Sequence, residues 1–372
     1  MSRIAVYGAS GYTGRLVAAE LARGGHEVVL AGRDEARLRA LGPLVAVAPL
    51  DEAAALARAL DGCAVVVNCA GPFLEHGAPV IEAAIRARVH YVDTAAEQAW
   101  VHEVFERYGP LAAPRGVALV PAAGFDFLPG DLACALAADG LGPLRELAVA
   151  YAVDRFRMSR GTLRSALAGM ARRPLAYEDG EWRFAPIGPV VARRRRAGDG
   201  RRRGLAHGAG RFAFPPPFGT RIVAPFPAGE IVTVPRHVAV RSVRTVIAAR
   251  TFTLGAEPLA PLVAAALPLA TMLARGPLPR VAGAVIGRLA EGPSEPARKR
   301  ARWIVVAAAH AHDGRHRRVA LTGVDIYGTT AASAAHAAAL LATTRLAGAL
   351  APAQAFEPVA FLDELGVARK SA

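Results

Sequence analysis

A glycine-rich stretch near the start of the chain constrains the fold more than any other feature. It reads Gly8-Ala-Ser-Gly11-Tyr-Thr-Gly14, and it follows a short apolar segment, Arg3–Tyr7. Behind it, apolar residues recur at helical spacing over Arg15–Ala22. A strand, a glycine turn and a helix in this order predict a phosphate site. The first glycine allows a tight turn, the second lets a pyrophosphate approach the helix N-terminus, and the third lets helix and strand pack closely.

Two groups of residues are expected to hold the cofactor that this turn predicts. One is the turn, and the other follows the apolar strand Ala64–Val67, because strand ends line the crevice of an open α/β sheet. The expected cofactor contacts are Gly8, Ser10, Gly11, Tyr12, Thr13, Gly14, Asn68, Ala70, Gly71 and Pro72. The second group is expected beside the ribose on the nicotinamide side.

The end of the second apolar run, His26–Ala31, indicates which cofactor binds. An NAD-specific enzyme places a carboxylate here, on the ribose hydroxyls. This chain reads Gly32-Arg33-Asp34, and a guanidinium suits a 2′-phosphate. We therefore expect NADP, with Arg33 contacting the 2′-phosphate, while Asp34 leaves a contact to a ribose hydroxyl open.

The first third of the chain alternates apolar strands with helices. Further strands are expected over Leu44–Ala48, Ala64–Val67, His90–Asp93 and Val117–Val120, with helices over Asp51–Leu60 and Gly77–Val89. Six strands alternating with helices predict a doubly wound parallel sheet, the Rossmann arrangement. We assign residues 1–125 to this NADP-binding domain.

From Asp126 onward the pattern changes to longer strands. The expected elements are a helix from Leu128, a helix over Thr162–Met170 and strands over Arg145–Asp154, Val238–Phe252, Arg302–His312 and Arg317–Asp325. They predict an α+β domain on an antiparallel sheet at residues 126–325, for substrate binding and dimerisation. In residues 326–372, an alanine-rich helix over Thr329–Leu350 is expected to pack back on the Rossmann domain.

The net charge of +14 comes almost entirely from arginine, since Lys299 and Lys370 are the chain's only lysines. No tyrosine lies four residues before either lysine, which excludes the Tyr-x-x-x-Lys mechanism of short-chain dehydrogenases. The densest basic run, Arg193–Arg196 with Arg201–Arg203, is typical of a solvated loop. An anion-binding surface, for nucleic acid, an acidic acyl carrier protein or a membrane face, is the alternative. We find no nucleic-acid fold signature, so no nucleic-acid partner is expected.

Several other functions are not expected from this sequence. Cys63, Cys69 and Cys134 form no CxxC motif, so neither a disulfide nor a metal site is expected. The first strand begins at once, with no secretory segment before it, which predicts a cytoplasmic protein. The apolar stretch Pro258–Ala274 is shorter than the roughly 20 residues that a membrane span needs. A lid-like helix pair is expected there, with a peripheral membrane contact as the alternative.

Four polar residues are the candidates for catalysis, because hydride transfer requires a proton donor or a group that polarises the substrate. They are Asp126, Glu97, Tyr91 and Thr162. Each also has a structural interpretation. Asp126 and Thr162 could cap helices. Glu97 could accept hydrogen bonds from backbone N–H groups, as could Asp93. Tyr91 could be packed within its strand.

Several stretches together resemble one family, the saccharopine dehydrogenase-like NADP-binding oxidoreductases. They are GASGYTG at 8–14, AGRD at 31–34, NCAGPF at 68–73, HYVDTAAE at 90–97, AGFDFLPGD at 123–131, SRGTLRS at 159–165, VTVPRH at 232–237, GPSEPAR at 292–298 and DIYGTTAASAAHAAALL at 325–341. Within the family the chain is most similar to the trans-acting enoyl reductases. The resemblance implies a Rossmann domain, an α+β domain with the substrate site, and a homodimer.

Three functions follow from the resemblance and the residues. The first is NADPH-dependent reduction of an activated C=C bond in an enoyl thioester or a polyketide- or lipid-like substrate. The second is reduction of a C=N bond, with Arg157, Arg160 and Arg164 available for substrate carboxylates. The third is an NADP-binding module without turnover.

Overall fold

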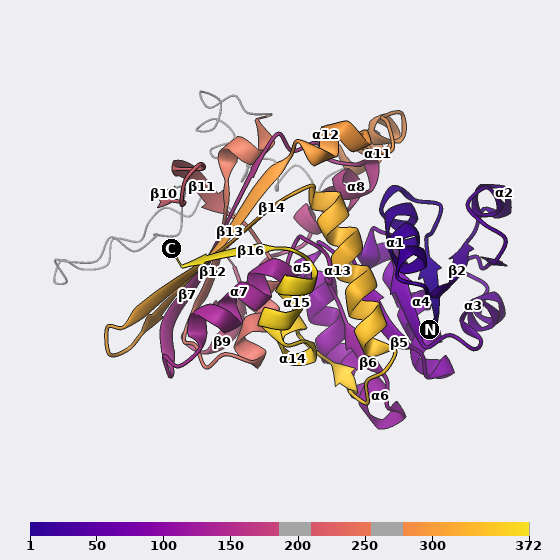
Figure 1. The fold of residues 1–372 in the computed structure, drawn as a ribbon, viewed down its shortest axis with the longest axis horizontal. Coiled ribbons are helices and arrows are strands. Elements are labelled where there is room, and N and C mark those ends of the chain that lie inside the picture. The colour runs from indigo at the N-terminus through magenta and orange to yellow at the C-terminus, as the bar shows by residue number, and fades with distance from the viewer. Residues whose placement is uncertain (186–209, 254–277, 372) are drawn as a thin grey trace.

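The computed structural model describes residues 1–185, 210–253 and 278–371, and it contains two sheets joined by helices (Figure 1). In the first sheet the strand order is β15-β6-β5-β4-β1-β2-β3, and every pairing is parallel. Its strands are β1 (Arg3–Tyr7), β2 (Glu27–Gly32), β3 (Val45–Val47), β4 (Val65–Asn68), β5 (His90–Asp93), β6 (Ala118–Val120) and β15 (Gly348–Ala349). This parallel sheet confirms the expected Rossmann arrangement.

Helices cover both faces of this sheet. They are α1 (Tyr12–Arg23), α2 (Glu35–Arg39), α3 (Ala53–Leu60), α4 (Phe73–Ala87), α5 (Gln98–Glu103) and α6 (Gly109–Ala112), with a π-helical turn at Val104–Tyr108. All four residues of β4 are buried, and its three consecutive valines, Val65–Val67, are typical of a strand covered on both faces. The strand order places the carboxyl ends of β1, β4 and β5 side by side.

The second sheet has the order β10-β11-β12-β7-β13-β14-β16, with β8 and β9 beside β12. Its strands are β7 (Leu144–Asp154), β8 (Leu175–Glu178), β9 (Glu181–Phe184), β10 (Gly210–Ala213), β11 (Thr220–Pro225), β12 (Val243–Ala248), β13 (Arg302–Ala311), β14 (His316–Val324) and β16 (Ala368–Ser371). The sheet is mixed rather than antiparallel, because β12 pairs with β7 in parallel. The long connection between these two strands makes a parallel pairing feasible.

The remaining helices lie around the second sheet and between the two halves. They are α7 (Leu128–Ala138), α8 (Arg160–Met170), α9 (Glu230–Thr233), α11 (Leu278–Gly287), α12 (Glu295–Lys299), α13 (Ile326–Leu341), α14 (Pro352–Ala355) and α15 (Pro358–Glu364). Helix α13 packs along α1 and against β4 and β5 (Figure 1). Since β15 extends the first sheet and β16 the second, the segment after residue 325 contributes to both halves.

Two expected elements differ most from their bounds in the structure. The helix expected over Thr329–Leu350 is α13, which begins earlier because the Asp325 carboxylate accepts the Gly328 N–H at 2.9 Å and caps it. It also ends earlier, and the chain then turns to form β15. The strand expected over Val238–Phe252 is only β12, and a 3₁₀ turn, Ala249–Phe252, follows it.

Two expectations fall outside the described residues: the arginine run at 193–203 and the apolar stretch Pro258–Ala274. In the part of the chain that the structure describes, no helix is long and apolar enough to cross a membrane. The same part holds no group of three or more His, Cys, Asp or Glu side chains placed to bind a metal ion.

Candidate active site

The glycine turn has the backbone geometry of a phosphate cradle. Gly8 has a φ of +78°, which favours glycine, and it turns the chain out of β1. A Cβ on Gly14 would lie 2.2 Å from the Gly8 carbonyl oxygen, so the third glycine is needed for α1 to pack against the turn. Gly11 is the N-cap of α1, and no side chain in the described part of the chain caps this helix. The turn therefore fits the pyrophosphate of a dinucleotide, which α1 would receive at its N-terminus.

The turn after β2 separates the roles of Arg33 and Asp34. Asp34 is the N-cap of α2, where its Oδ1 accepts the Arg37 N–H at 3.1 Å. This capping bond gives Asp34 a local structural role. Arg33 is exposed and lines the cleft beside the glycine turn. The arrangement is consistent with Arg33 contacting a 2′-phosphate.

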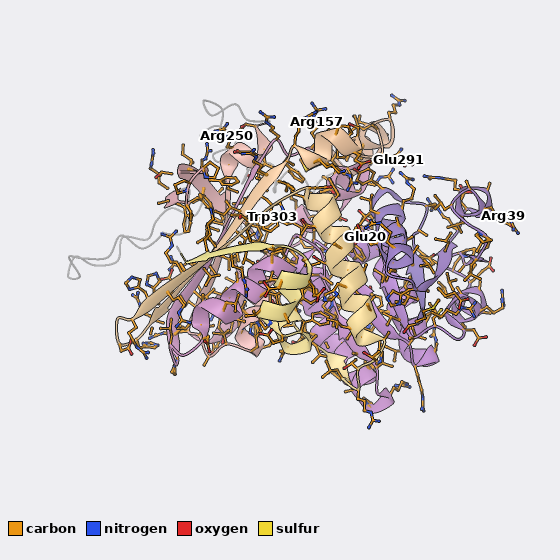
Figure 2. The ribbon with its side chains drawn as sticks, viewed as in Figure 1. Glu20, Arg39, Arg157, Arg250, Glu291 and Trp303 are labelled. Carbon is orange, nitrogen blue, oxygen red and sulfur yellow. The ribbon has the colours of Figure 1, made fainter. Side chains whose placement is uncertain are left out.

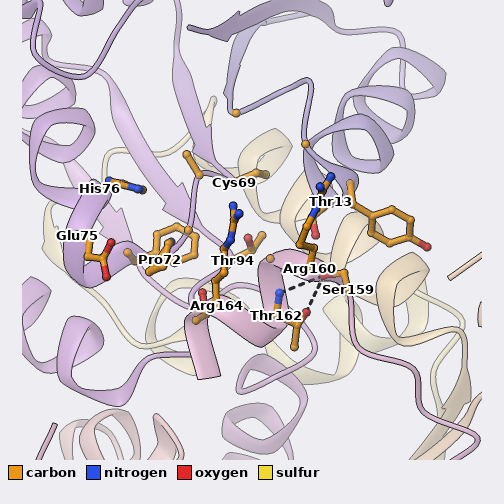
Figure 3. Close-up of a pocket in the computed structure, with 18 of the residues that line it drawn as sticks. Thr13, Cys69, Pro72, Glu75, His76, Thr94, Ser159, Arg160, Thr162 and Arg164 are labelled. Atoms are coloured by element: carbon orange, nitrogen blue, oxygen red, sulfur yellow. Dashed lines mark hydrogen bonds between the residues drawn. The ribbon is translucent and has the colours of Figure 1, made fainter. Parts of the chain in front are cut away.

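A cleft of about 1610 Å³ runs between the two halves of the molecule. The glycine turn, the β2 turn and the loop after β4 line one side, and α8 with the start of α13 lines the other. Figure 3 shows Arg160 pointing toward Thr13 and Arg164 pointing toward the loop that carries Cys69. Cofactor and substrate residues predicted from separate parts of the sequence therefore share one cavity.

The structure places most of the predicted site residues at this cleft. Those that line it are Gly8, Ser10, Gly11, Tyr12, Thr13, Arg33, Ala70, Gly71, Pro72, Asp126 and Thr162. Four others lie behind its wall: Gly14, Asn68, Tyr91 and Glu97. Gly14 is needed for packing, as described above, and the other three hold the loops that form the wall.

Asn68 and Tyr91 belong to a buried network beneath the loop after β4. The Asn68 Oδ1 accepts the Ala70 N–H at 3.0 Å, and its amide nitrogen donates to the Tyr91 hydroxyl at 3.1 Å. That hydroxyl in turn donates to Asp93 Oδ2 at 3.0 Å. Both Asn68 and Tyr91 are 0% exposed. Direct contact of Asn68 with the cofactor, and proton exchange by Tyr91, are therefore not supported by the geometry.

Glu97 holds the same wall from the other side. Its two carboxylate oxygens accept the N–H groups of Phe73 and Leu74, both at 2.8 Å, at the start of α4. The side chain is 1% exposed and does not line the cleft. Burial raises the pKa of Glu97, and these backbone bonds oppose that shift. The expectation that Glu97 is a proton donor is not supported, and its structural interpretation accounts for the contacts.

Asp126 differs from these carboxylates because it faces the cleft. It follows β6, is half-buried, and makes no hydrogen bond or ion pair with another of the described residues. Burial raises the pKa of Asp126 to about 6. A carboxyl group that titrates near neutral pH in a cleft has the properties of a general acid.

A hydroxyl cluster lies on the second wall of the cleft. Thr162 Oγ1 lies 2.9 Å from Ser159 Oγ and 3.1 Å from the Tyr327 hydroxyl. The Tyr327 hydroxyl also accepts the Ser159 N–H at 2.6 Å. Burial raises the pKa of Tyr327, and negative charge on Asp126 adds to the shift. Tyr327 was not among the residues expected from the sequence, although it lies in the DIYGTT stretch, two residues after the helix-capping Asp325.

Known proteins resemble the chain in sequence and in fold. Residues 4–120 match the family of the saccharopine dehydrogenase NADP binding domain. A putative trans-acting enoyl reductase of Mycobacterium tuberculosis is 33% identical over 180 residues, which is 44% of this chain and 43% of that relative. A trans-acting enoyl reductase of Mycobacterium ulcerans is 33% identical over 159 residues, or 38% of either chain. The matched region is thus less than half the length of these relatives.

The fold similarity extends over the whole chain. Apo histidine-tagged saccharopine dehydrogenase (L-Glu forming) from Saccharomyces cerevisiae superimposes over 100% of both chains, with a TM-score of 0.59 and 15% identity. At this identity the match shows a shared fold. The matches confirm the expected resemblance to saccharopine dehydrogenase-like proteins and trans-acting enoyl reductases, and the expected cofactor, NADP. Residues 4–120 of the chain thus carry the saccharopine dehydrogenase NADP binding domain, and the chain as a whole has the saccharopine dehydrogenase fold.

Proposed function

We propose that the protein is an NADPH-dependent reductase of an activated C=C bond, in an enoyl thioester or a polyketide- or lipid-like acyl substrate. The observation that carries the proposal is Asp126, a carboxyl group of raised pKa that faces the cleft between the cofactor turn and the hydroxyl cluster. The names of the enoyl reductase relatives support the choice of substrate class.

The reduction adds a hydride to the β-carbon and a proton to the α-carbon of the enoyl group. Bound NADPH supplies the hydride. Thr162 donates a hydrogen bond to the thioester carbonyl, which withdraws electrons from the double bond. Ser159 and Tyr327 orient the Thr162 hydroxyl through the contacts described above.

Asp126 supplies the proton to the α-carbon and is reprotonated from the solvent that reaches the cleft. With a pKa of about 6, a fraction of the Asp126 side chains carries a proton at neutral pH. Because only the protonated form donates, turnover is expected to fall as the pH rises through 6. The buried wall built by Asn68, Tyr91 and Glu97 keeps the nicotinamide side of the cleft rigid.

One observation favours a second candidate, the reduction of a C=N bond. The Arg164 side chain points into the cleft beside the loop after β4 (Figure 3). A guanidinium at this place suits the carboxylate of an amino-acid-derived imine.

The Arg164 guanidinium also suits the phosphate of a phosphopantetheine arm, which agrees with delivery of the enoyl substrate by an acidic acyl carrier protein. We propose such a carrier as partner and a homodimer as the assembly.

The test follows a deuterium label from NADPH carrying deuterium at C4. The protein is incubated with enoyl thioesters, cyclic imines and ketones, and mass spectrometry locates the label. Deuterium at the β-carbon of the acyl chain is expected. Deuterium on a carbon bonded to nitrogen would replace the proposal with the second candidate. Tight NADPH binding without transfer to any compound would favour a module without turnover.

A further inference from the structure

Three arginine side chains from three different helices meet on one carboxylate, Glu291. Arg15 of α1 lies 2.7 Å from Oε2 of this carboxylate, and Arg37 of α2 lies 2.6 Å from its Oε1. Arg160 of α8 lies 3.2 Å from the same Oε1. Figure 2 shows Glu291 at the junction of the two halves. One carboxylate balances only part of the charge of three guanidinium groups.

The arginines of this cluster also hold the glycine turn. The Ser10 carbonyl oxygen accepts hydrogen bonds from Arg15 at 2.7 Å and from Arg37 at 3.0 Å. Arg37 lies one helical turn beyond Arg33 and the β2 turn. The adenosine ribose of a dinucleotide lies between the glycine turn and the end of β2 in a Rossmann fold. The cluster is therefore beside the expected position of the 2′-phosphate.

Glu291 reaches this place on a segment that is fixed at both ends. The backbone N–H of Arg160 donates to the Glu291 carbonyl at 3.0 Å, and its side chain donates to the Gly287 carbonyl at 3.0 Å. The Tyr12 hydroxyl donates to the Pro293 carbonyl at 2.6 Å. A Cβ on Gly292 would lie 2.6 Å from the Tyr12 ring, so glycine allows the close approach. The fold thus delivers a carboxylate to the cofactor turn from the second half of the molecule.

We propose that Arg15, Arg37 and Arg160 bind the 2′-phosphate of NADP, and that Glu291 occupies this site until the phosphate displaces it. A phosphate monoester carries up to two negative charges and three strong acceptor oxygens, against one charge and two oxygens for a carboxylate. Three arginines therefore gain more from the phosphate than from Glu291. The hydrogen bond from Arg15 lowers the pKa of Glu291, so the competing group is an ion at neutral pH.

This exchange makes Glu291 a specificity-determining residue. NADPH must displace the carboxylate to place its 2′-phosphate, whereas NADH lacks that phosphate and leaves the ion pairs intact. Removing the negative charge of Glu291 should therefore strengthen binding of 2′-phosphorylated ligands selectively. Arg33, at the start of the same turn, also lines the cleft and would contact the same phosphate.

The test compares E291Q with the wild-type chain by calorimetry, using adenosine 2′,5′-bisphosphate and 5′-ADP as probes. We expect E291Q to bind the bisphosphate about tenfold more tightly. This is the change in affinity that corresponds to one charge-assisted contact at a partly exposed site. The affinity for 5′-ADP should stay within about twofold, since that probe lacks the 2′-phosphate. The matched control is E295Q, because Glu295 pairs with Lys299 at 2.6 Å outside the cluster and should change neither affinity.

Equal tightening of both probes would overturn the proposal, since the arginines would then bind the phosphate on C5′ that both probes carry. Weaker binding of the bisphosphate by E291Q would also overturn it, because Glu291 would then support the site. A second variant, R37Q, tests the arginine site while Glu291 itself remains unchanged. The Arg37 side chain is 48% exposed, so the fold should tolerate this substitution. R37Q should lose bisphosphate affinity and keep 5′-ADP affinity; an equal loss for both would contradict the assignment.

Discussion

The carboxylate at the end of β5, Asp93, and the carboxylate in the loop after β6, Asp126, differ in how completely they are hydrogen-bonded. Asp93 accepts four hydrogen bonds, from Tyr91, Ala95, Trp100 and Ala122, at 2.7 to 3.0 Å. Asp126, after the adjacent strand, has no such partner among the described residues and faces the cleft. A carboxylate whose acceptor sites are all used holds the scaffold, and one whose sites are free is available to a ligand.

Glu230 shows that a carboxylate oxygen without a hydrogen bond does not by itself make a residue a candidate proton donor. It is 0% exposed, the Tyr151 hydroxyl donates to its Oε1, and its Oε2 has no hydrogen-bond partner among the residues that the structure describes. Burial raises the pKa of Glu230 to about 8. Glu230 does not line the cleft, however. Free acceptor capacity and access to the cleft occur together in Asp126, which is why we assign the proton transfer to that residue.

The largest effect is expected for Asp126→Asn. The variant cannot donate a proton, so turnover should fall about a hundredfold or more, the lower range for loss of a general acid. Its affinity for NADPH and its melting temperature should match those of the wild type. Steady-state kinetics and calorimetry measure the two quantities separately. Turnover within about twofold of wild type would remove Asp126 from the mechanism.

Glu97→Gln should show the opposite pattern, a loss of stability with turnover retained. The amide would present a donor to one of the two backbone N–H groups that the carboxylate now accepts. We expect the free energy of unfolding to fall by about 2 kcal/mol, the contribution of hydrogen bonds to a buried charged group. Urea denaturation measures it, with Glu103→Gln on the surface as control. A stable Glu97→Gln variant without turnover would reverse the roles of Glu97 and Asp126.

Arg33→Ala should weaken NADPH binding about tenfold and leave NADH binding nearly unchanged, as expected for one charge-assisted bond to the 2′-phosphate. Fluorescence titration with both cofactors checks the result. Arg39→Ala is the control, since Arg39 is exposed and pairs with Glu35 outside the cleft. If Arg33→Ala and the wild type discriminate the cofactors equally, Arg33 does not read the phosphate.

Thr162→Val should give the smallest of these effects, a reduction in kcat/KM of about fivefold to tenfold. The substitution preserves shape and removes one hydrogen bond to the substrate carbonyl. The matched control is Thr329→Val, because the exposed Thr329 hydroxyl donates to the Val324 carbonyl at 3.3 Å and does not line the cleft. An unchanged kcat/KM would limit Thr162 to the hydrogen bonds at the start of α8.

Local pattern was sufficient to predict the Rossmann half. The glycine turn, the buried strand β4 and the arginine after β2 each depend on a few neighbouring residues, and the structure contains all three. The six expected strands of that sheet are present, and β15, only two residues long, was not foreseen. The parallel pairing of β12 with β7 was also missed, because strand direction is decided by a connection of many residues.

The candidate site was predictable only in part, because the missing information concerns contacts between distant segments. Tyr327 reaches Thr162 across 165 residues, and Glu291 reaches Arg15 across 276. The sequence identified Asp126 and Glu97 equally as strand-end carboxylates. Only the structure shows that two backbone N–H groups of α4 donate hydrogen bonds to Glu97, whereas Asp126 has no such partner among the described residues.

The most direct test of this account is the pKa of Asp126, measured by carbon-13 NMR titration of the side-chain carboxyl in the wild-type chain, with Asp126→Asn to assign the signal. We predict a value of about 6, against 3.8 for an ordinary aspartate. Because the folded state then binds the proton more tightly than the unfolded state, the free energy of unfolding should also fall as the pH rises from about 4 to 6. A value near 3.8 would contradict the account, since Asp126 would be ionised and unable to donate at neutral pH.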